Sequence, residues 1–600
     1  MPKRTRKIDL PKRIAIVDTD RCKPHKCRRE CEKFCPVNAQ GKMCVTHSGT
    51  GKAEVSEISC TGCNICTKKC PFRAITIVNL PSALGSVTHR YSANGFQLYG
   101  LPMPERECVL GMIGANGCGK TTALLILIGE IIPNLGDFRG KEKSRRNLNL
   151  RYRGTNVQNY LKELDGGLKI GYKSQNIQPL RERNVLIKNL LCKDVMDSIG
   201  LTGLEDRTCE HLSDGELQRV AIGMTLSSKS DIMVFDEPCT YLDIFQRMKV
   251  ARLIRESNVP YKIVIEHDFT ALDYMADKVC LLYGAPAAYG NVTLPMSTGE
   301  GLNCFLDGYI TYSNTRFRSY SLDFKFSKED RQGTDKMPGL HYPDFSVSYQ
   351  DFTLTSSAGS ITQGTVTVLL GPNGSGKTTF IRSLAGQCPA NGAVLDLGIT
   401  VSYKEQNVYI NSTQLVRDYL LEKTCGMILD PNFRREIFDV MNIDHLMDRE
   451  LGTLSGGEMQ KISLVASLGK PADLYLIDEP SCYLDVESVL IIARMLKRFA
   501  INNHKYMFVV EHDFNLGLYL ADDVLLFDSG FVSRPLPSKE GFNLFLRNLD
   551  VTMRRDHDTL RPRINKPGSQ NDITQKLTGD LTHDHIDTPH TSFAVPDLSW

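Results

Sequence analysis

The sequence predicts an α/β protein in which a small cysteine-rich domain precedes two copies of a larger domain. Gly114–Thr121 and Gly371–Thr378 share the pattern Gly-x4-Gly-Lys-Thr, and Leu-Ser-x-Gly-Glu follows each of them. The serines of the second motif, Ser213 and Ser455, lie 242 residues apart, which is too far for the unit of a solenoid. Regularly spaced cysteines precede both copies. We therefore expect a duplicated domain behind a cysteine module.

Length and composition agree with this organisation. A chain of 600 residues allows about three to five domains. With 41% hydrophobic and 24% charged residues it has the composition of a globular protein with large cores. No run approaches the ~20 apolar residues of a membrane span, and no apolar segment follows the basic N-terminus. Neither a membrane domain nor a secretory signal is expected.

The distribution of cysteines indicates a reducing compartment. The chain has 19 cysteines, of which nine precede residue 71 and the others are scattered. This is not the pattern of a disulfide framework, so we expect a cytoplasmic protein.

The eight spaced cysteines form two runs. Cys-x4-Cys-x3-Cys-x3-Cys-Pro begins at Cys22, and Cys-x2-Cys-x2-Cys-x3-Cys-Pro begins at Cys60. The second is the spacing of two-cluster bacterial ferredoxins, in which the cysteine before proline ligates the other 4Fe–4S cluster. That rule predicts one cluster on Cys22, Cys27, Cys31 and Cys70 and a second on Cys60, Cys63, Cys66 and Cys35.

Two four-cysteine zinc sites are the alternative, although zinc knuckles rarely have three close cysteines followed by Cys-Pro. Cys44 lies outside both sets and is interpreted as a small core residue. Ile14–Val17 and Ala74–Val78 are expected to form short strands beside the module, as in a ferredoxin-like sheet.

Each Gly-x4-Gly-Lys-Thr motif follows an apolar strand, Cys108–Ile113 or Thr365–Leu370, and opens a helix. This is the context of a phosphate loop, whose backbone amides and helix N-terminus hold phosphates. Lys120 and Lys377 are expected to reach the β- and γ-phosphates of ATP. The expected nucleotide-binding residues of the loops are Gly114, Ala115, Asn116, Gly117, Cys118, Gly119, Lys120, Thr121 and Thr122, and Gly371, Pro372, Asn373, Gly374, Ser375, Gly376, Lys377, Thr378 and Thr379.

Two adjacent carboxylates end a short apolar stretch in each copy. Asp236 and Asp478 fit a buried strand that delivers a carboxylate to the shell around Mg²⁺. Glu237 and Glu479 are placed to polarise the attacking water. With two intact sets of such residues, we expect an ATPase.

The Leu-Ser-x-Gly-Glu motifs carry a resemblance to the ATP-binding cassette (ABC) superfamily. The further residues that match it are Gln175 and Gln406 for the Q-loop, Tyr241–Asp243 and Tyr483–Asp485 for the D-loop, and His267 and His512 for the switch histidine. The resemblance implies catalytic roles for both histidines beside the two glutamates. It implies magnesium ligands at Thr121, Gln175, Thr378 and Gln406.

The same resemblance implies that each ATP lies between the phosphate loop of one cassette and the signature of the other. ATP on Lys120 would meet Ser455 and Gly457, and ATP on Lys377 would meet Ser213 and Gly215. Asp214 stands where the superfamily has glycine, which places a carboxylate near developing negative charge. The site of Lys377 and Ser213 is therefore expected to be weaker or differently regulated.

The iron–sulfur module with twin cassettes resembles ABC subfamily E, the ribosome-recycling ATPases also called RNase L inhibitors, over roughly residues 10–566. The matching segments include Asn79–Pro81, Thr88–Tyr91, Phe305–Tyr309, Gly469–Asp473 and Arg561–Lys566. The family implies a monomeric, ATP-driven factor that splits post-termination or stalled ribosomes, with cassette closure moving the iron–sulfur lobe. Implied partners are the small subunit with its rRNA and a class-1 release factor or its rescue homologue. A role for initiation factors and a nuclear presence stay open.

The expected boundaries are an iron–sulfur domain at 1–80, a first ABC domain at 81–282, a hinge at 283–320, a second ABC domain at 321–550, a second hinge segment at 551–566 and a disordered tail at 567–600. A basic insertion at about 137–167 is a candidate for gripping rRNA phosphates, against the alternative of a charged surface loop. Its basic residues are Lys141, Lys143, Arg145, Arg146, Arg151 and Arg153. Candidates for stacking on adenine are Tyr91 or Phe96 and Tyr349 or Phe352.

Two other function classes compete with ribosome splitting. An ATP-gated electron-transfer protein would use the clusters for redox chemistry, but no flavin, haem or nicotinamide site accompanies them. A non-catalytic adaptor for an RNA or a nuclease would not need both Glu237 and Glu479.

Overall fold

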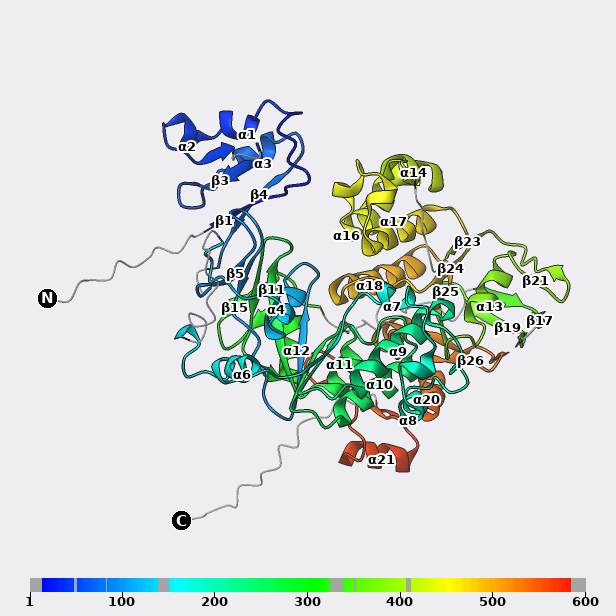
Figure 1. The fold of residues 1–600 in the computed structure, drawn as a ribbon. Coiled ribbons are helices and arrows are strands. Elements are labelled where there is room, and N and C mark those ends of the chain that lie inside the picture. The colour runs from blue at the N-terminus through cyan, green and yellow to red at the C-terminus, as the bar shows by residue number, and fades with distance from the viewer. Residues whose placement is uncertain are drawn as a thin grey trace, which may run out of the picture.

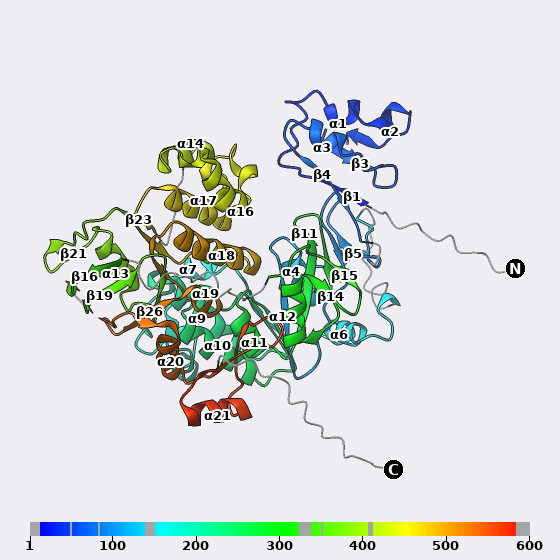
Figure 2. The same cartoon turned by 180° about the vertical axis from the view of Figure 1, so that it is seen from behind.

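The computed structural model describes residues 13–47, 51–81, 84–138, 150–322, 324, 338–349, 352–405 and 412–583. Figures 1 and 2 show a small N-terminal lobe beside a first cassette, with a second cassette across from both. Within these residues no helix is both long and apolar enough to cross a membrane.

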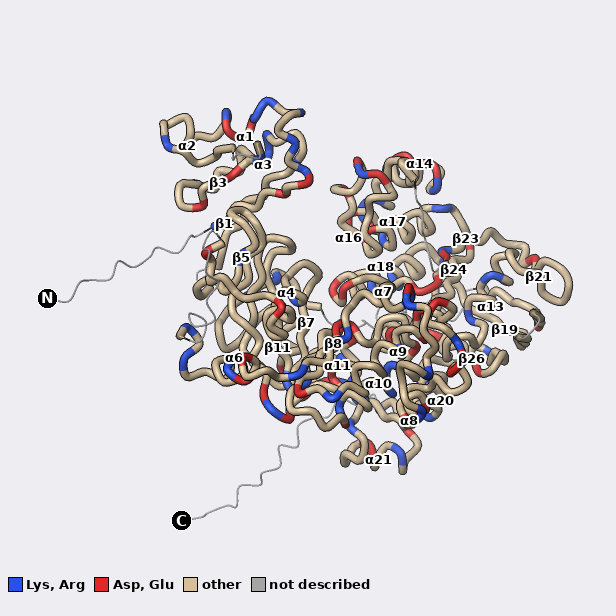
Figure 3. The backbone as a smooth tube through the Cα atoms, viewed as in Figure 1, with Lys and Arg blue, Asp and Glu red and all other residues tan. Residues whose placement is uncertain are grey.

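The N-terminal lobe has the two flanking strands that the sequence predicts. β1 (Arg13–Val17) pairs antiparallel with β4 (Ile75–Asn79). Between them lie α1 (Glu30–Lys33), α2 (Pro36–Ala39), α3 (Ile65–Lys69) and a hairpin of β2 (Val45–His47) and β3 (Ala53–Val55). Charges of both signs lie on the outside of this lobe (Figure 3).

Asn94 fastens the lobe to the first cassette. Its Nδ2 donates to the backbone oxygens of Ala15 and Val55 at 2.9 Å each, and its Oδ1 accepts from the Val55 amide at 2.8 Å. Arg90 of the cassette adds an ion pair to Glu57 of the lobe at 2.8 Å, with both side chains largely buried. All of these contacts run between the lobe and the first cassette. Buried polar groups keep their hydrogen bonds in folded proteins, so these contacts fasten the lobe to that cassette.

The first cassette is built on a nine-stranded sheet in the order β5-β6-β12-β11-β7-β10-β9-β8, with β13 paired to β11. The strand that leads into the phosphate loop, β7, is central and parallel to both neighbours. Its loop therefore emerges at the carboxyl edge of the sheet, where open α/β sheets bind ligands. The bounds are β5 (Val87–Arg90), β6 (Gln97–Tyr99), β7 (Cys108–Gly114), β8 (Ile170–Lys173), β9 (Ile232–Asp236), β10 (Tyr261–Ile265), β11 (Lys278–Ala285), β12 (Tyr289–Val292) and β13 (Met296–Ser297).

The second cassette repeats this sheet strand for strand, which confirms the predicted duplication and fold class. Its order is β17-β18-β27-β26-β20-β25-β24-β23, with β28 paired to β26. The bounds are β17 (Phe345–Ser348), β18 (Thr353–Ser356), β20 (Val366–Leu370), β23 (Val401–Lys404), β24 (Leu474–Asp478), β25 (Tyr506–Val510), β26 (Asp523–Asp528), β27 (Phe531–Val532) and β28 (Leu536–Pro537).

Matching helices in the two cassettes carry the motifs. The phosphate-loop lysines begin α4 (Lys120–Leu127) and α13 (Lys377–Leu384), and the signatures begin α9 (Asp214–Ser227) and α17 (Gly456–Gly469). The other equivalent pairs are α10 (Ile244–Glu256) with α18 (Val486–Asn502), α11 (Phe269–Met275) with α19 (Phe514–Leu520), and α12 (Thr298–Asp307) with α20 (Ser538–Leu549).

The cassettes share one apolar core. Phe245 of α10 packs edge-on against Phe545 of α20, with ring centroids 5.5 Å apart. Contacts of this kind hold the two motif-bearing edges face to face.

The expected boundaries need two corrections. The boundary expected at Tyr283 falls inside a strand, because β11 continues to Ala285 and β12 belongs to the same sheet. Disorder from residue 567 is wrong for the described part of the tail, where α21 (Gln570–Thr578) and β31 (Thr582–His583) form. β31 joins β29 (Met553–Arg555) and β30 (Pro562–Ile564) in a three-stranded sheet.

Buried polar contacts explain why this polar segment is ordered. Asn565 Nδ2 donates to Gln575 Oε1 at 2.6 Å and to Thr552 Oγ1 at 2.9 Å, and all three side chains are buried. Composition alone does not reveal such a network. Residues 584–600 lie outside the described residues.

The basic insertion is described only at its two ends. Lys141, Lys143, Arg145 and Arg146 lie outside the described residues. Arg151 donates to the backbone oxygen of Val87 at 2.6 Å, so it supports the fold. Arg153 is exposed just before α6 (Asn156–Asp165).

Candidate active site

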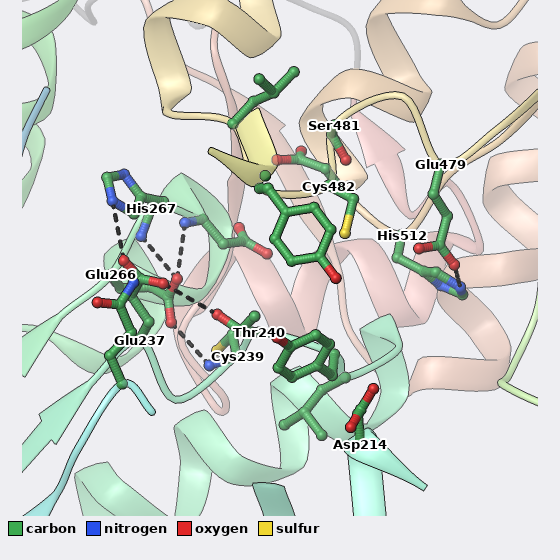
Figure 4. A pocket seen from close by; sticks show the side chains of 18 of the residues that line it. Asp214, Glu237, Cys239, Thr240, Glu266, His267, Glu479, Ser481, Cys482 and His512 are labelled. Carbon is green, nitrogen blue, oxygen red and sulfur yellow. Dashed lines mark hydrogen bonds and ion pairs between the residues drawn. The ribbon is translucent and has the colours of Figure 1, made fainter. Parts of the chain in front are cut away.

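One cavity of about 1440 Å³ holds motif residues of both cassettes (Figure 4). The predicted residues that line it are Asn116, Gly117, Gly119, Lys120, Thr121, Thr122, Gln175, Ser213, Gly215, Asp236, Glu237 and His267 of the first cassette, and Asn373, Gly374, Gly376, Lys377, Thr378, Thr379, Ser455, Gly457, Glu479 and His512 of the second. Those that do not line it are Gly114, Ala115, Cys118, Gly371, Pro372, Ser375 and Asp478. Gln406 lies outside the described residues.

Both phosphate-loop lysines fold back onto their own loops. Lys120 Nζ donates to Gly114 O at 2.8 Å, and Lys377 Nζ donates to Gly371 O at 2.9 Å and Pro372 O at 2.7 Å. Burial lowers the pKa of both ammonium groups, to about 8 for Lys377. A triphosphate offers these cations charged acceptors, which make stronger hydrogen bonds than carbonyl oxygens.

The donor set beside each phosphate loop fits a magnesium nucleotide. Burial raises the pKa of Asp236 and of Asp478 to about 6. Asp236 Oδ2 is buried and has no hydrogen-bond partner within the described residues, and Asp478 lies beside the Thr378 hydroxyl. Carboxylate and hydroxyl oxygens are the ligands that Mg²⁺ prefers, and a buried unpaired oxygen is costly unless a cation or donor reaches it.

Each predicted switch histidine faces the glutamate of its own cassette. His267 Nε2 lies 3.5 Å from Glu237 Oε1, and His512 Nε2 lies 3.3 Å from Glu479 Oε1. Burial by itself would raise the pKa of Glu237, but the neighbouring His267 and the charge of Lys120 outweigh it and leave that pKa below its usual value. Glu237 is therefore a carboxylate at neutral pH, as a residue that polarises water must be.

Both predicted catalytic glutamates have a strained backbone. Their φ values are 49° for Glu237 and 45° for Glu479, in the left-handed region that non-glycine residues rarely occupy. Lys173 Nζ donates to Glu237 O at 3.0 Å, and Gln218 Nε2 donates to the same oxygen at 2.8 Å. Such strain costs of order 1–3 kcal/mol and persists only where neighbours hold it.

The second cassette repeats these supports. Lys404 Nζ donates to Asp478 O at 2.9 Å, and Gln460 Nε2 donates to Glu479 O at 2.6 Å. The sequence interpretation missed all four supporting residues. Their signal is positional, because each lysine lies two residues before the predicted Q-loop glutamine in both cassettes.

Two further carboxylates, also missed, hold the switch loops. Glu266 Oε1 accepts the His267 amide at 2.7 Å, and Glu511 Oε2 accepts the His512 amide at 2.8 Å. Burial raises the pKa of both, to about 7 for Glu511. The repeated tripeptide Glu-His-Asp is the signal that the sequence offers for them.

Contacts between the cassettes follow the predicted head-to-tail pairing. The Asn373 amide of the second phosphate loop donates to Asp243 Oδ2 of the first D-loop at 2.9 Å. The reciprocal contact, from the Asn116 amide to Asp485 Oδ2, is longer at 3.5 Å. A Cβ on Gly215 would stand 4.0 Å from the side-chain nitrogen Nδ2 of Asn373, so the first signature faces the second phosphate loop. The two sites therefore contain matching residues, but the contact from Asn373 to Asp243 is shorter than the contact from Asn116 to Asp485.

Arg247 lies where the two switch regions meet. Its Nη1 is 2.9 Å from Asp268 Oδ2, and both side chains are largely buried. Asp513 occupies the equivalent position in the second cassette. Burial raises its pKa to about 6, and the positive charge of Arg247 acts in the opposite direction. The position of Arg247 in the second cassette is held by Val489, so one cation serves both carboxylates.

The structure gives Asp214 a partner that the sequence analysis did not identify. Its Oδ1 lies 2.6 Å from Nη2 of Arg181, at the end of α7 (Gln178–Arg181). The carboxylate therefore has a direct cationic partner, which opposes the repulsion that the sequence predicts. The partner was missed because it lies 33 residues before Asp214.

Three of the four aromatic candidates line the cavity, and Tyr349 does not. Phe96 and Phe352 pack at equivalent glycines: a Cβ on Gly119 or Gly376 would meet these rings at 2.6 and 2.9 Å. Both glycines also have positive φ, so no other residue fits there without strain. The two phenylalanines thus support the loops.

The cysteines gather in the two predicted sets. Cys35 lines one small cavity with Cys60, Cys63 and Cys66, and the additional thiol there is Cys44. The other set surrounds Cys31, whose pKa is raised to about 12 by burial and by the neighbouring Cys70, Cys27 and Cys22. Within the described residues no three ligating side chains converge as closely as a single metal ion requires. Cysteine thiolates are the ligands of 4Fe–4S clusters, so the donor chemistry of both sets fits such clusters.

Comparison with known proteins is decisive for the family. The ABC transporter model matches residues 103–240 and 354–482, and the model described as "Possible Fer4-like domain in RNase L inhibitor, RLI" matches residues 13–42. The chain is 43% identical over 591 residues to "ABC transporter E family member 1" of Arabidopsis thaliana, and the alignment covers 94% of this chain and 98% of that protein. The chain belongs to ABC family E.

Solved structures of this family agree. One titled "Model of ribosome-bound archaeal Pelota and ABCE1" has a TM-score of 0.87 at 39% identity and covers 95% of this chain and 99% of its own. A complex of archaeal ribosomal stalk protein aP1 with the archaeal ribosome recycling factor aABCE1 has a TM-score of 0.78 at 36% identity, covering 83% and 99%. Membership of the family makes the twin cassettes an ATPase.

Proposed function

We propose that this ABC family E protein is an ATP-driven ribosome recycling factor that separates post-termination or stalled ribosomes into subunits. The observation that carries the proposal is the fastening of the cysteine lobe to the first cassette through Asn94. Closure of the cassettes on ATP then displaces the lobe as one body with the first cassette. Related structures supply the setting, since one shows archaeal Pelota and ABCE1 bound to the ribosome and another shows the archaeal recycling factor aABCE1 with the ribosomal stalk protein aP1.

Nucleotide acts as the bridge between the cassettes. In our proposal the ATP on Lys377 is contacted by Ser213 and Gly215, and the ATP on Lys120 by Ser455 and Gly457. Thr121, Gln175, Thr378 and Gln406 approach the bound Mg²⁺. Glu237 and Glu479 activate the attacking water, and His267 and His512 contact the γ-phosphate. The remaining phosphate-loop residues named above cradle the phosphates.

The cysteine lobe carries two 4Fe–4S clusters in this proposal, on Cys22, Cys27, Cys31 and Cys70 and on Cys60, Cys63, Cys66 and Cys35. Bound clusters would make the lobe stiff enough to transmit force. Iron analysis of anaerobically purified protein should give about eight irons per chain with the electron paramagnetic resonance of reduced 4Fe–4S clusters. Two zinc ions per chain instead would refute the assignment.

The proposed partners are the ribosome, chiefly the small subunit and its rRNA, and a class-1 release factor or a rescue homologue such as Pelota, in the cytoplasm. The exposed Arg153 and its neighbours in the basic insertion are candidate rRNA contacts. Participation with initiation factors belongs to the same proposal.

Light scattering of purified ribosomes mixed with this protein, ATP and a release factor tests the function. Wild-type protein should generate free subunits over repeated cycles. The paired variant Glu237→Gln and Glu479→Gln should bind ribosomes but fail to turn over, and Asp206→Ala, an exposed surface change, should behave as wild type. Intact ribosomes after incubation with the wild type would rule out recycling.

A further inference from the structure

The first signature carries a negative charge where the second carries none. Asp214 is the first residue of α9 and follows Ser213 directly, whereas Gly456 holds this position in α17. Asp214 and Lys377 line the same cavity. In Figure 4, Asp214 comes from the first cassette and lies on the side of the view that holds Glu479 and His512. An unpaired carboxylate there would repel the triphosphate on Lys377.

Arg181 is the group that counters this charge. Its Nη2 approaches Asp214 Oδ1 to 2.6 Å, which is short even for a charge-assisted hydrogen bond. Arg181 ends α7, six residues after Gln175, so the pair also ties the signature to the segment behind the Q-loop. No other ion pair to Asp214 occurs within the described residues.

The pair is suited to function more than to stability. The Arg181 side chain is 30% exposed and that of Asp214 is 51% exposed. Exposed ion pairs contribute little to the stability of folded proteins. Near a highly charged ligand, however, the sign of each neighbouring charge decides whether the ligand is attracted or repelled.

We propose that Arg181 is a positioning residue of the Lys377 nucleotide site. It neutralises Asp214 and holds the first signature in place, so that Ser213 and the first amides of α9 can meet the γ-phosphate. Its effect is confined to ATP on Lys377, because the Lys120 site uses the other signature. The proposal depends on ATP hydrolysis by twin cassettes and not on the role at the ribosome.

Kinetics in two single-site backgrounds test this assignment. In Glu237→Gln protein, hydrolysis occurs only at the Lys377 site, and adding Arg181→Ala should lower kcat/KM for ATP about tenfold. In Glu479→Gln protein, where only the Lys120 site turns over, the same change should have less than about a twofold effect. Arg183→Ala is the matched control, since it removes an exposed arginine two residues away.

Rescue separates charge neutralisation from damage to the fold. Adding Asp214→Gly to Arg181→Ala should restore kcat/KM to within about twofold of the value in the Glu237→Gln background. Raising the salt concentration should reduce the difference in kcat/KM between Arg181→Ala and that background. The thermal unfolding midpoint should stay unchanged in all these variants. An Arg181→Ala variant as active as its background, or a double variant as slow as Arg181→Ala alone, would overturn the proposal.

Discussion

The junction between the C-terminal sheet (β29, β30 and β31) and the first cassette gives the most quantitative prediction. Asp273 of α11 accepts from Arg563 Nε at 2.8 Å, from Arg563 Nη2 at 3.0 Å and from Arg561 Nη1 at 3.2 Å. Asp273 is 4% exposed and Arg561 is 0% exposed at the side chain. The helix α11 begins two residues after His267, so this cluster connects the C-terminal sheet to the switch region.

Asp273→Ala should open this junction. The change leaves Arg561 buried without its carboxylate, and breaking a buried pair in this way costs about 3–5 kcal/mol. Since about 1.4 kcal/mol corresponds to a factor of ten, local opening should become roughly a hundredfold to several thousandfold more frequent. A protein of several domains does not unfold in two states, so a single melting temperature would not isolate this effect.

Hydrogen exchange measures the local opening directly. Amides of Met553–Arg555 should lose protection by at least about a hundredfold in Asp273→Ala, while β24 and β25 keep theirs. The control is Asp206→Ala, which removes the exposed ion pair to Lys188 at 2.7 Å and should change exchange by less than about tenfold. Unchanged protection at Met553–Arg555 would show that the cluster does not hold the junction.

Three other predictions follow from the same structure. Mg²⁺-dependent ATP binding should weaken below about pH 6, where Asp478 gains a proton, and above about pH 8, where Lys377 loses one; an affinity that stays flat across both limits, measured with a fluorescent ATP analogue, would contradict these assignments. Asn94→Ala should loosen the cysteine lobe by removing three buried hydrogen bonds, at a cost of about 1–3 kcal/mol for each group left unpaired; proteolysis between lobe and first cassette should then speed up, and an unchanged rate would oppose a rigid attachment. Arg153→Glu should weaken binding to small subunits and reduce the dependence of that binding on salt. If the variant bound small subunits as tightly as the wild type at both low and high salt, the proposed rRNA contact would be refuted.

Much of the fold and site follows from local pattern. Phosphate loops, signatures and the strands before Asp236 and Asp478 are contiguous motifs, so spacing alone locates them. The duplication then doubles each signal. The flanking strands of the cysteine lobe were predictable for the same reason.

Residues that act across long sequence distances were not predictable. Arg181 meets Asp214, Asn94 meets Ala15, and Lys173 meets Glu237 only after the sheet has formed. Polar composition also misled, because Gln575 lies in a polar segment that buried hydrogen bonds help to order. The boundary placed at 282 falls inside a continuous strand, which no break in composition marks.

The central claim is that each ATP is shared between the cassettes, and crossed signature variants test it most directly. In the Glu479→Gln background, where only the ATP on Lys120 is hydrolysed, Ser455→Arg should abolish turnover and Ser213→Arg should leave it largely intact. The opposite pattern should appear in the Glu237→Gln background. If each signature variant instead silenced the phosphate loop of its own cassette, the head-to-tail arrangement would be contradicted.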